Sequence, residues 1–195
     1  MNDAQDKGQV VVISGPSGVG KGTICRELLQ RLDRASVSIS ATTRPQSPQE
    51  EDGRDYYFMT RQEFEERLTQ GLFLEHAEVF GNYYGTPKDK VLEAMADGKI
   101  VLLDIDVQGG RQIKAALPEA KMVFILPPSL EVLGQRLTGR GRDDAEAMQR
   151  RLREADEEIG IGKRYYEYLI TNDDLEQAVQ QVVGLIRSTG CEGEN

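Results

Sequence analysis

The sequence predicts an α/β fold: a doubly wound parallel sheet with an inserted small mixed α/β subdomain and a short mobile lid. Three observations lead to this prediction. Short β-branched runs alternate with segments of helical periodicity, a glycine-rich loop follows the first run, and the alternation breaks between residues 39 and 86. We expect a single domain over residues 1–195, with a core of 9–38 and 87–190, the insertion at 39–86 and the lid at about 136–158.

The core elements follow from local patterns along the chain. Continuous apolar runs predict four buried parallel strands: Val10–Ser14, Ile100–Asp104, Met122–Leu126 and Tyr168–Thr171. Apolar residues at helical spacing predict helices between and after them: Lys21–Leu32, Val107–Leu117, a segment from the capping residue Ser129 to about Thr138, and a closing helix capped within Asn172–Asp174. Strands that alternate with helices over short connections are typical of a parallel sheet.

Two stretches interrupt this order. Between residues 39 and 86, Asp55–Met59 and Phe73–Phe80 predict strands of a small mixed sheet. Thr60 followed by Glu63 fits a capping box, which predicts a helix from Arg61 to about Gln70. The second stretch, Gly139–Asp144, is too polar and too rich in glycine for a core element.

The composition is that of a folded protein and excludes several classes of partner. Hydrophobic residues make up 38% and charged residues 29%, which is enough apolar material for a core. With 33 acidic and 24 basic residues the net charge is −9, so the chain as a whole repels polyanions. We therefore expect neither nucleic acid nor an anionic membrane surface as a main partner.

The lack of a recognisable targeting signal and the spacing of the cysteines favour the cytoplasm. Residues 1–9 contain no apolar run, so we expect no signal peptide, and no window approaches the roughly 20 apolar residues of a membrane helix. Cys25 and Cys191 are far apart in the sequence and form no CxxC motif. They are expected to be free thiols in a reducing compartment, and the protein to be cytoplasmic.

The strongest local signal is a phosphate-binding loop (P-loop) between the first predicted strand and the first predicted helix. Glycines let backbone N–H groups turn around a phosphate chain, the helix N-terminus adds its dipole, and the lysine adds a mobile charge. The residues expected to bind ATP here are Gly15, Pro16, Ser17, Gly18, Val19, Gly20, Lys21, Gly22 and Thr23. The usual hydroxyl residue after the lysine is Gly22 here, so Thr23 becomes the candidate for the Mg²⁺ shell. The alternative is a glycine-rich turn with a surface lysine.

An acid at the end of a neighbouring strand supplies the second usual part of such a site. Asp104 ends the predicted strand Ile100–Asp104, where it can hold the Mg²⁺ shell. Asp106 projects to the same side if strand geometry persists. The alternative for this pair is a helix N-cap and a surface acid.

The inserted segment is suited to a phosphorylated acceptor. Ser40 and Arg44 lie in a hydroxyl-rich loop that could hold a monophosphate, and Tyr56 adds a phenol. Glu75 is an acid inside an apolar run, followed by Tyr84 and Thr86. The plainer alternatives are an edge-strand glutamate in solvent, tyrosines that only pack, and, for the arginines between 136 and 153, a solvated helix face.

These residues together resemble the bacterial guanylate kinases, a family of P-loop nucleoside monophosphate kinases, over about Gln9 to Arg187. The segments that carry the resemblance are GPSGVGKGT, SISATTRP, EEDGRDYYF, FLEHAEVFGNYYGT, VLLDIDVQGG, FILPPS, RLTGRGRDD and YLITNDD. FGNYYGT and LDIDVQG are specific to the family in a way that a lone P-loop is not. The resemblance implies ATP and GMP, and also dGMP, as substrates, with Mg²⁺ as the cofactor and direct in-line phosphoryl transfer as the reaction. The insertion is then a GMP-binding subdomain.

The resemblance also implies a role for each site residue. It assigns the GMP phosphate to Ser40, Arg44, Tyr56 and Tyr84. It assigns the guanine base to Glu75, Thr86 and Asp106. The transferring phosphoryl group is assigned to Lys21, Arg44, Arg140 and Arg151, with Arg136 as a weaker member. Mg²⁺ is assigned to Thr23 and Asp104, and Asn172 is placed near the adenine.

The chemistry of the base supports guanine independently. Guanine presents two donors on its Watson–Crick edge, which match a carboxylate at Glu75, whereas adenine presents an acceptor at N1 that a carboxylate repels. Two other functions stay open at this point: a guanylate-kinase-like binding module without catalysis, and a P-loop kinase of another phosphorylated small molecule. One departure stands out. Ser47 occupies the position of the family's second phosphate-binding arginine, and the oligomeric state is not indicated by the sequence.

Overall fold

The structure, a computed structural model, describes residues 8–138 and 145–188. Its centre is a five-stranded sheet in the order β2-β7-β1-β8-β9, in which every neighbouring pair is parallel. The strands are β1 (Gln9–Ser14), β2 (Ala35–Val37), β7 (Ile100–Asp104), β8 (Lys121–Leu126) and β9 (Tyr168–Thr171). The predicted fold class is confirmed. Because β1 lies in the middle of the sheet, the loop that leaves its carboxyl end opens at the centre of that edge.

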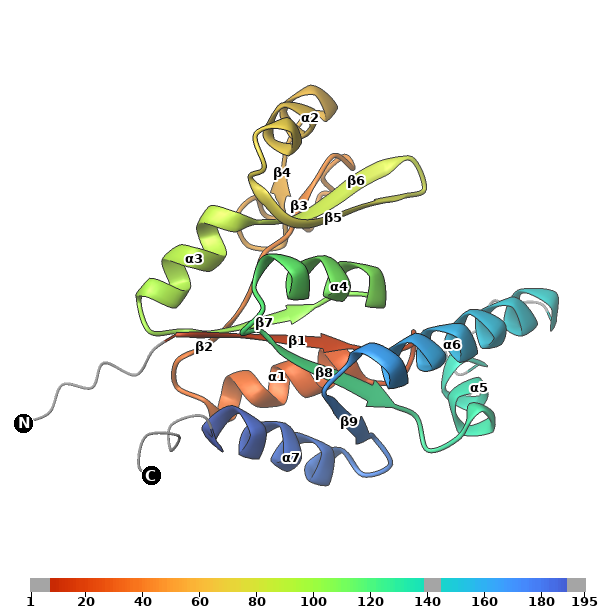
Figure 1. Cartoon of the computed structure of the whole chain (residues 1–195). Helices are drawn as coiled ribbons and strands as arrows, with labels where there is room; N and C mark the ends of the chain where they lie inside the picture. The colour runs from red at the N-terminus through yellow and green to blue at the C-terminus, as the bar shows by residue number, and fades with distance from the viewer. Residues whose placement is uncertain (1–7, 139–144, 189–195) are drawn as a thin grey trace, which may run out of the picture.

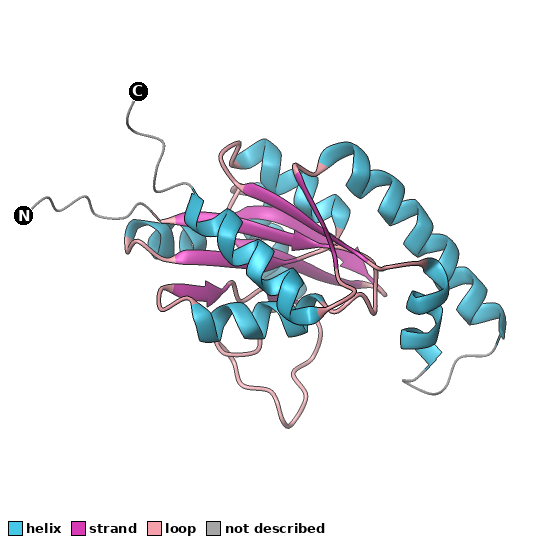
Figure 2. Cartoon of the chain, turned by 90° about the horizontal axis from the view of Figure 1, so that it is seen from below, coloured by secondary structure: helices cyan, strands magenta, loops and turns pink. Residues whose placement is uncertain are grey.

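Helices cover both faces of this sheet (Figure 1). One face packs against α1 (Lys21–Arg31), α5 (Leu130–Thr138) and α7 (Leu175–Arg187), and the other against α3 (Lys88–Ala96) and α4 (Val107–Ala116). The long helix α6 (Ala145–Tyr165) contributes apolar residues to both cores. Alternation along β1 explains the two cores, since Val11 and Ile13 face one while Val10 and Val12 face the other. Figure 2 shows the helices on either side of the sheet from below.

A second, four-stranded sheet in the order β4-β3-β6-β5 stands above α3 and α4 (Figure 1). Its strands are β3 (Ala41–Thr42), β4 (Tyr57–Phe58), β5 (Phe73–Val79) and β6 (Asn82–Pro87), with α2 (Arg61–Thr69) packed on it. β3 is parallel to β4, and the other two pairs are antiparallel, so the sheet is mixed as predicted. Phe64 of α2 is fully buried and stacks on Phe73 and Tyr83, with ring centroids 4.3 and 5.2 Å away.

The two sheets are joined through α4. The Gln112 side chain of α4 accepts a hydrogen bond from the backbone N–H of His76 at 3.1 Å and donates one to the His76 carbonyl at 3.0 Å. This pair of bonds satisfies the backbone N–H and carbonyl of His76 on the outer edge of β5, where a strand otherwise leaves such groups unpaired. These two bonds tie β5 to α4. His76 takes part in this connection through its backbone N–H and carbonyl and not through its imidazole.

Local signals predicted several helix starts correctly. The Thr60 hydroxyl accepts from Glu63 N and the Glu63 carboxylate accepts from Thr60 N, which confirms the capping box. Ser129 accepts from Val132 N at 3.2 Å, and Asp174 caps α7 by accepting from Gln177 N at 2.8 Å. The predictions for both caps are confirmed.

Some predictions about elements were wrong in extent. The strand predicted over Asp55–Met59 is only Tyr57–Phe58, because residues 51–56 form a turn closed by the hydrogen bonds of Asp55. The strand predicted to Phe80 ends at Val79, and Phe80 turns the hairpin with a positive φ of 49°. The polar stretch Gly139–Asp144 lies outside the described residues. Within the described parts of the chain, no helix is long and apolar enough to span a membrane.

Candidate active site

The P-loop connects β1 to α1 and is shaped by its glycines. Gly15 and Gly20 have φ angles of 148° and 106°, a backbone conformation that favours glycine. Gly20 is also the N-cap of α1, so the first N–H groups of the helix point into the loop. The Lys21 ammonium donates to the Gly15 carbonyl at 2.6 Å and so lies across the mouth of the loop. The loop thus combines a helix N-terminus and a cation, as a phosphate chain requires.

Asn172 fixes the back of this loop. Its side-chain nitrogen donates to the Val19 carbonyl at 2.8 Å, and the side chain is only 7% exposed. A Cβ atom at Gly20 would lie 2.6 Å from the same nitrogen, so the close approach needs glycine there. Arg136 donates to the Asn172 carbonyl at 3.1 Å and is thereby held beside the loop. The structure brings Asn172 and Arg136 to the P-loop, while contact of Asn172 with adenine stays a prediction.

Asp104 lies opposite the start of α1. Its Oδ2 atom is 3.8 Å from the position that a Cβ atom of Gly22 would take. Burial raises the pKa of Asp104, and the positive charge of Lys21 counteracts this. The other predicted Mg²⁺ ligand, the Thr23 hydroxyl, accepts a hydrogen bond from Arg26 at 3.3 Å. Both candidates are oxygen donors, which suit Mg²⁺. Among the described residues, no three His, Cys, Asp or Glu side chains cluster to hold a metal alone, so phosphate oxygens and water would have to complete the shell.

Asp106 does not continue the strand. β7 ends at Asp104, and Asp106 is instead the N-cap of α4, where its carboxylate accepts from Gln108 N and Gly109 N, each at 2.8 Å. The condition for a shared strand geometry is therefore not met, because β7 ends two residues before Asp106, and the N-cap alternative holds for Asp106. The N-cap places Asp106 near Glu75 all the same, since its charge contributes to raising the pKa of Glu75.

Glu75 is a buried acid between the two sheets. It is 7% exposed, which rules out the solvent-edge alternative, and its Oε1 accepts a hydrogen bond from the Thr86 hydroxyl at 2.6 Å. Its Oε2 lies 3.0 Å from where a Cβ atom of Gly109 would be, close to the first turn of α4. Burial raises the pKa of Glu75, and the Thr86 hydrogen bond opposes that shift. A buried carboxylate with one oxygen beside a helix N-terminus is suited to accept hydrogen bonds from a ligand.

Arg44 lies among the predicted phosphate ligands. Its guanidinium carbon is 5.5 Å from the ring centroid of Tyr56, whose ring in turn packs edge-on against Tyr84 at 6.0 Å. The pKa of Arg44 is raised first by its hydrogen bond to Glu50 and more weakly by one to Tyr84. Ser40 directly precedes β3, and its carbonyl accepts from Tyr57 N at 2.9 Å. The structure thus brings Ser40, Arg44, Tyr56 and Tyr84 into one part of the second sheet.

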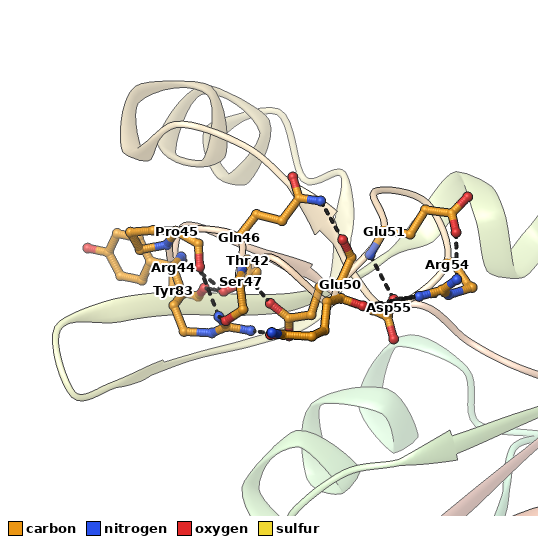
Figure 3. Close-up of polar contacts among 11 residues, drawn as sticks. Thr42, Arg44, Pro45, Gln46, Ser47, Glu50, Glu51, Arg54, Asp55 and Tyr83 are labelled. Carbon is orange, nitrogen blue, oxygen red and sulfur yellow. Dashed lines mark hydrogen bonds and ion pairs between the residues drawn. The ribbon is translucent and has the colours of Figure 1, made fainter.

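The neighbourhood of Arg44 is shown in Figure 3. Its Nη2 forms an ion pair with Glu50 Oε1 at 2.7 Å, and its Nη1 donates to the Pro45 carbonyl at 2.8 Å. Arg54, the other cation of this segment, is 60% exposed and pairs with Glu51 and Asp55. In this chain, Ser47 occupies the position of the family's second phosphate-binding arginine. Arg54 does not replace that arginine, because it is exposed and paired with acids of its own turn.

Glu158 is an acid of this region that was not predicted from the sequence. Glu158 on α6 lies near Lys21 and Asp106: burial raises its pKa, the charge of Lys21 opposes the shift and that of Asp106 adds to it. Arg151 precedes it by two helical turns and so shares its face of α6. Arg140 lies outside the described residues. No local pattern marks Glu158, because its position depends on how α6 packs across the core.

The comparisons with known proteins agree with one another. The family model described as guanylate kinase matches residues 7–189. A guanylate kinase of Trichormus variabilis is 52% identical over 90% of this chain and 87% of its own length, and one of Symbiobacterium thermophilum is 51% identical over 92% and 85%. The crystal structure of guanylate kinase from Anaplasma phagocytophilum superimposes with a TM-score of 0.72 at 32% identity, covering 96% of this chain and 89% of that one. The chain belongs to the guanylate kinase family.

Proposed function

We propose that this protein transfers the γ-phosphoryl group of ATP to GMP and releases ADP and GDP. The observation that carries this proposal is the buried pair of Glu75 and Thr86, whose side-chain oxygens are 2.6 Å apart, in a chain that also carries a P-loop between β1 and α1. A P-loop alone indicates a nucleoside triphosphate, and the buried carboxylate indicates what the other substrate must offer, namely hydrogen-bond donors.

Guanine offers two such donors, N1–H and the 2-amino group. We assign both to Glu75, and we assign Thr86 and Asp106 to further contacts with the base. A nucleobase with an acceptor at N1 would leave the buried carboxylate facing a lone pair, which is costly in a site shielded from water. Sites of this kind can discriminate by about 10⁴-fold or more.

The phosphate of GMP is assigned to Ser40, Arg44, Tyr56 and Tyr84. Three of these are neutral hydroxyl donors and one is a cation, so the site depends on Arg44 for its positive charge. The aromatic ring beside the guanidinium supports this assignment, since Arg44 is held over Tyr56 rather than extended into solvent.

The transferring phosphoryl group carries its charge on equatorial oxygens, and catalysis is mainly a matter of position and compensating charge. We assign Lys21, whose ammonium donates to the Gly15 carbonyl of the P-loop, to the β- and γ-phosphates. Arg140, Arg151 and Arg44 are assigned to the same group, with the lid at about 136–158 bringing the first two. Mg²⁺, when bound with ATP between Thr23 and Asp104, would neutralise phosphate charge. No residue needs to act as a strong base.

We further propose that residues 39–86 act as the GMP-binding subdomain of a single-domain enzyme, that dGMP is also an acceptor, and that the enzyme works in the cytoplasm. The alternatives are a binding module without catalysis and a kinase of another small phosphate ester. The intact P-loop with Lys21 disfavours the first, and the Glu75–Thr86 pair disfavours the second.

Release of ADP from ATP and Mg²⁺ tests the proposal when GMP, dGMP, AMP and ribose 5-phosphate are offered side by side. We expect fast release with GMP, slower or similar release with dGMP, and background release with the other two. No release with any acceptor would favour the binding module, and release with ribose 5-phosphate would overturn the assignment of the base.

A further inference from the structure

The loop after β3 carries more negative than positive charge. Residues 44–55 contain the cations Arg44 and Arg54 and four acids: Glu50, Glu51, Asp52 and Asp55. A phosphate monoester is itself an anion, so a loop of this charge is an unusual place to bind one. The way in which the acids are paired explains how it can still do so.

Glu50 is held from three directions (Figure 3). Its backbone N–H donates to the Ser47 carbonyl at 3.0 Å, which closes a turn, and its own carbonyl accepts from Gln46 Nε2 at 2.7 Å. Its carboxylate accepts from Ser47 N at 2.8 Å through Oε2 and from Arg44 through Oε1. The Arg44 guanidinium, with the Ser47 N–H, lowers the pKa of Glu50 to about 2. The carboxylate is therefore a fixed anion at neutral pH.

Glu50 uses only one edge of the Arg44 guanidinium. The ion pair runs through Nη2, and the side chains are 28% and 21% exposed, which makes this pair better shielded than its neighbour. Nη1 donates to the Pro45 carbonyl and approaches the Ser47 hydroxyl at 3.4 Å. The guanidinium plane is thereby fixed near the rings of Tyr56 and Phe58. An arginine fixed in this way loses little rotamer freedom when a ligand binds.

We propose that Glu50 is a positioning residue for the acceptor phosphate: with the turn at Ser47 it holds Arg44 in the orientation that receives the phosphate of GMP. The proposal rests on the proposed function, since it takes Arg44 as a phosphate ligand. It explains how a single arginine can serve where the family has two. Here the position of the second arginine is Ser47, whose backbone N–H and hydroxyl hold the Glu50–Arg44 pair in place of a second cation.

A simple electrostatic role of Glu50 predicts the opposite effect. If Glu50 acted only as a nearby negative charge, its removal would strengthen the binding of an anionic substrate. If it positions Arg44, its removal weakens binding although the site becomes less negative. The sign of the change therefore separates the two roles.

The test compares Glu50→Gln with Glu51→Gln. Both substitutions remove one negative charge from adjacent residues of the same loop, but Glu51 pairs with Arg54 at 67% exposure, and none of the hydrogen bonds drawn in Figure 3 joins it to Arg44. Initial rates of ADP release are measured against GMP at saturating ATP, and against ATP at saturating GMP. Unfolding midpoints of both variants are compared with the original protein.

We expect Glu50→Gln to raise the KM for GMP about fivefold, because a partly shielded ion pair is lost, with the KM for ATP within about twofold of the original value. Because Arg44 is also assigned to the transferring phosphoryl group, kcat should fall as well. Glu51→Gln should leave the KM for GMP unchanged or lower it by up to about twofold. Glu50→Asp, which keeps the charge, should restore part of the loss. An unchanged or lower KM for GMP in Glu50→Gln overturns the proposal.

A third variant separates this inference from the proposed function. If Arg44→Gln leaves the KM for GMP unchanged, the acceptor-phosphate site itself is misassigned. If Arg44→Gln raises it strongly while Glu50→Gln does not, only the role of Glu50 is wrong. In the Arg44→Gln background, Glu50→Gln should have no further weakening effect, because the residue it positions is gone.

Discussion

Replacing Glu75 by glutamine removes one negative charge from the space between the two sheets and keeps the shape of the side chain. The amide oxygen of the Glu75→Gln variant can still accept the hydrogen bond that Thr86 donates at 2.6 Å in the original protein. Burial raises the pKa of Glu75 in the folded chain. The stability linked to this group is therefore present at pH values below the unfolded pKa and is lost as the pH rises through the folded one. At neutral pH the variant should be at least as stable as the original.

The effect on GMP follows from the number of donors that guanine presents. A carboxylate can accept from both N1–H and the 2-amino group, whereas an amide offers one oxygen and turns its NH₂ toward the other donor. Loss of one hydrogen bond to a charged group costs about 1.5–3 kcal/mol, and an unpaired buried donor adds a further penalty of about 1–3 kcal/mol. We take about 3–4 kcal/mol in total, which corresponds to roughly a 100- to 1,000-fold loss in kcat/KM.

Initial rates of ADP release at varied GMP measure this loss, and the KM for ATP and the unfolding midpoint are measured on the same preparation. Glu78→Gln is the matched control, because Glu78 is an exposed acid on the same strand with no assigned role. We expect the loss for GMP only in Glu75→Gln, with the KM for ATP within about twofold. A Glu75→Gln enzyme with unchanged kcat/KM for GMP would refute the assignment of Glu75 to the base.

Other substitutions test the P-loop, the acceptor loop and the packing of α6. Lys21→Ala should reduce turnover at least about 100-fold without unfolding the chain, because its charge serves the phosphates; residual turnover above a few per cent contradicts this. Ser47→Arg should lower the KM for GMP, and less so at high salt, because it adds a bidentate donor beside Arg44; an unchanged or higher KM would mean that Glu50 takes up the new charge. Gly162→Ala should destabilise the fold by about 1–3 kcal/mol, since a Cβ atom would lie 2.5 Å from the Phe124 ring. Gly160→Ala, whose Cβ atom would have nothing within 4 Å, should stabilise the fold by about 0.5–1 kcal/mol. Thermal unfolding of the two variants measures both effects.

The core of the fold could be predicted from the sequence because its signals are local. β1, β7 and β8 are continuous apolar runs, and the P-loop follows one of them directly. The strands β2, β3 and β6 and the helix α3 were not anticipated. β2 has three residues at the edge of its sheet, and β6 (Asn82–Pro87) has a polar, aromatic sequence whose extended form depends on pairing with β3 and β5 on both sides.

From the residue patterns alone, the site could be predicted only where a residue's environment is set by its neighbours in the chain, and the roles of Glu75 and Thr86 came from the family resemblance. Lys21 comes at the end of the predicted P-loop, and Asp104 comes at the end of a predicted strand. Their places in the fold could therefore be predicted from these two local elements. The local structure at Asp106 was ambiguous, because an acid before Val-Gln-Gly-Gly suits both an extended strand and a helix cap. In the structure, Asp106 is the N-cap of α4. Glu50 and Glu158 were not identified, since their roles depend on a turn and a helix packing that no local pattern encodes.

In the proposed function, the buried carboxylate of Glu75 selects guanine as the acceptor base. The most direct test is the ratio of kcat/KM for GMP to that for AMP, with the diphosphate products separated and identified by chromatography. We expect GDP as the product and a ratio of about 10⁴ or more in favour of GMP. A ratio near one, or AMP as the better acceptor, would contradict it.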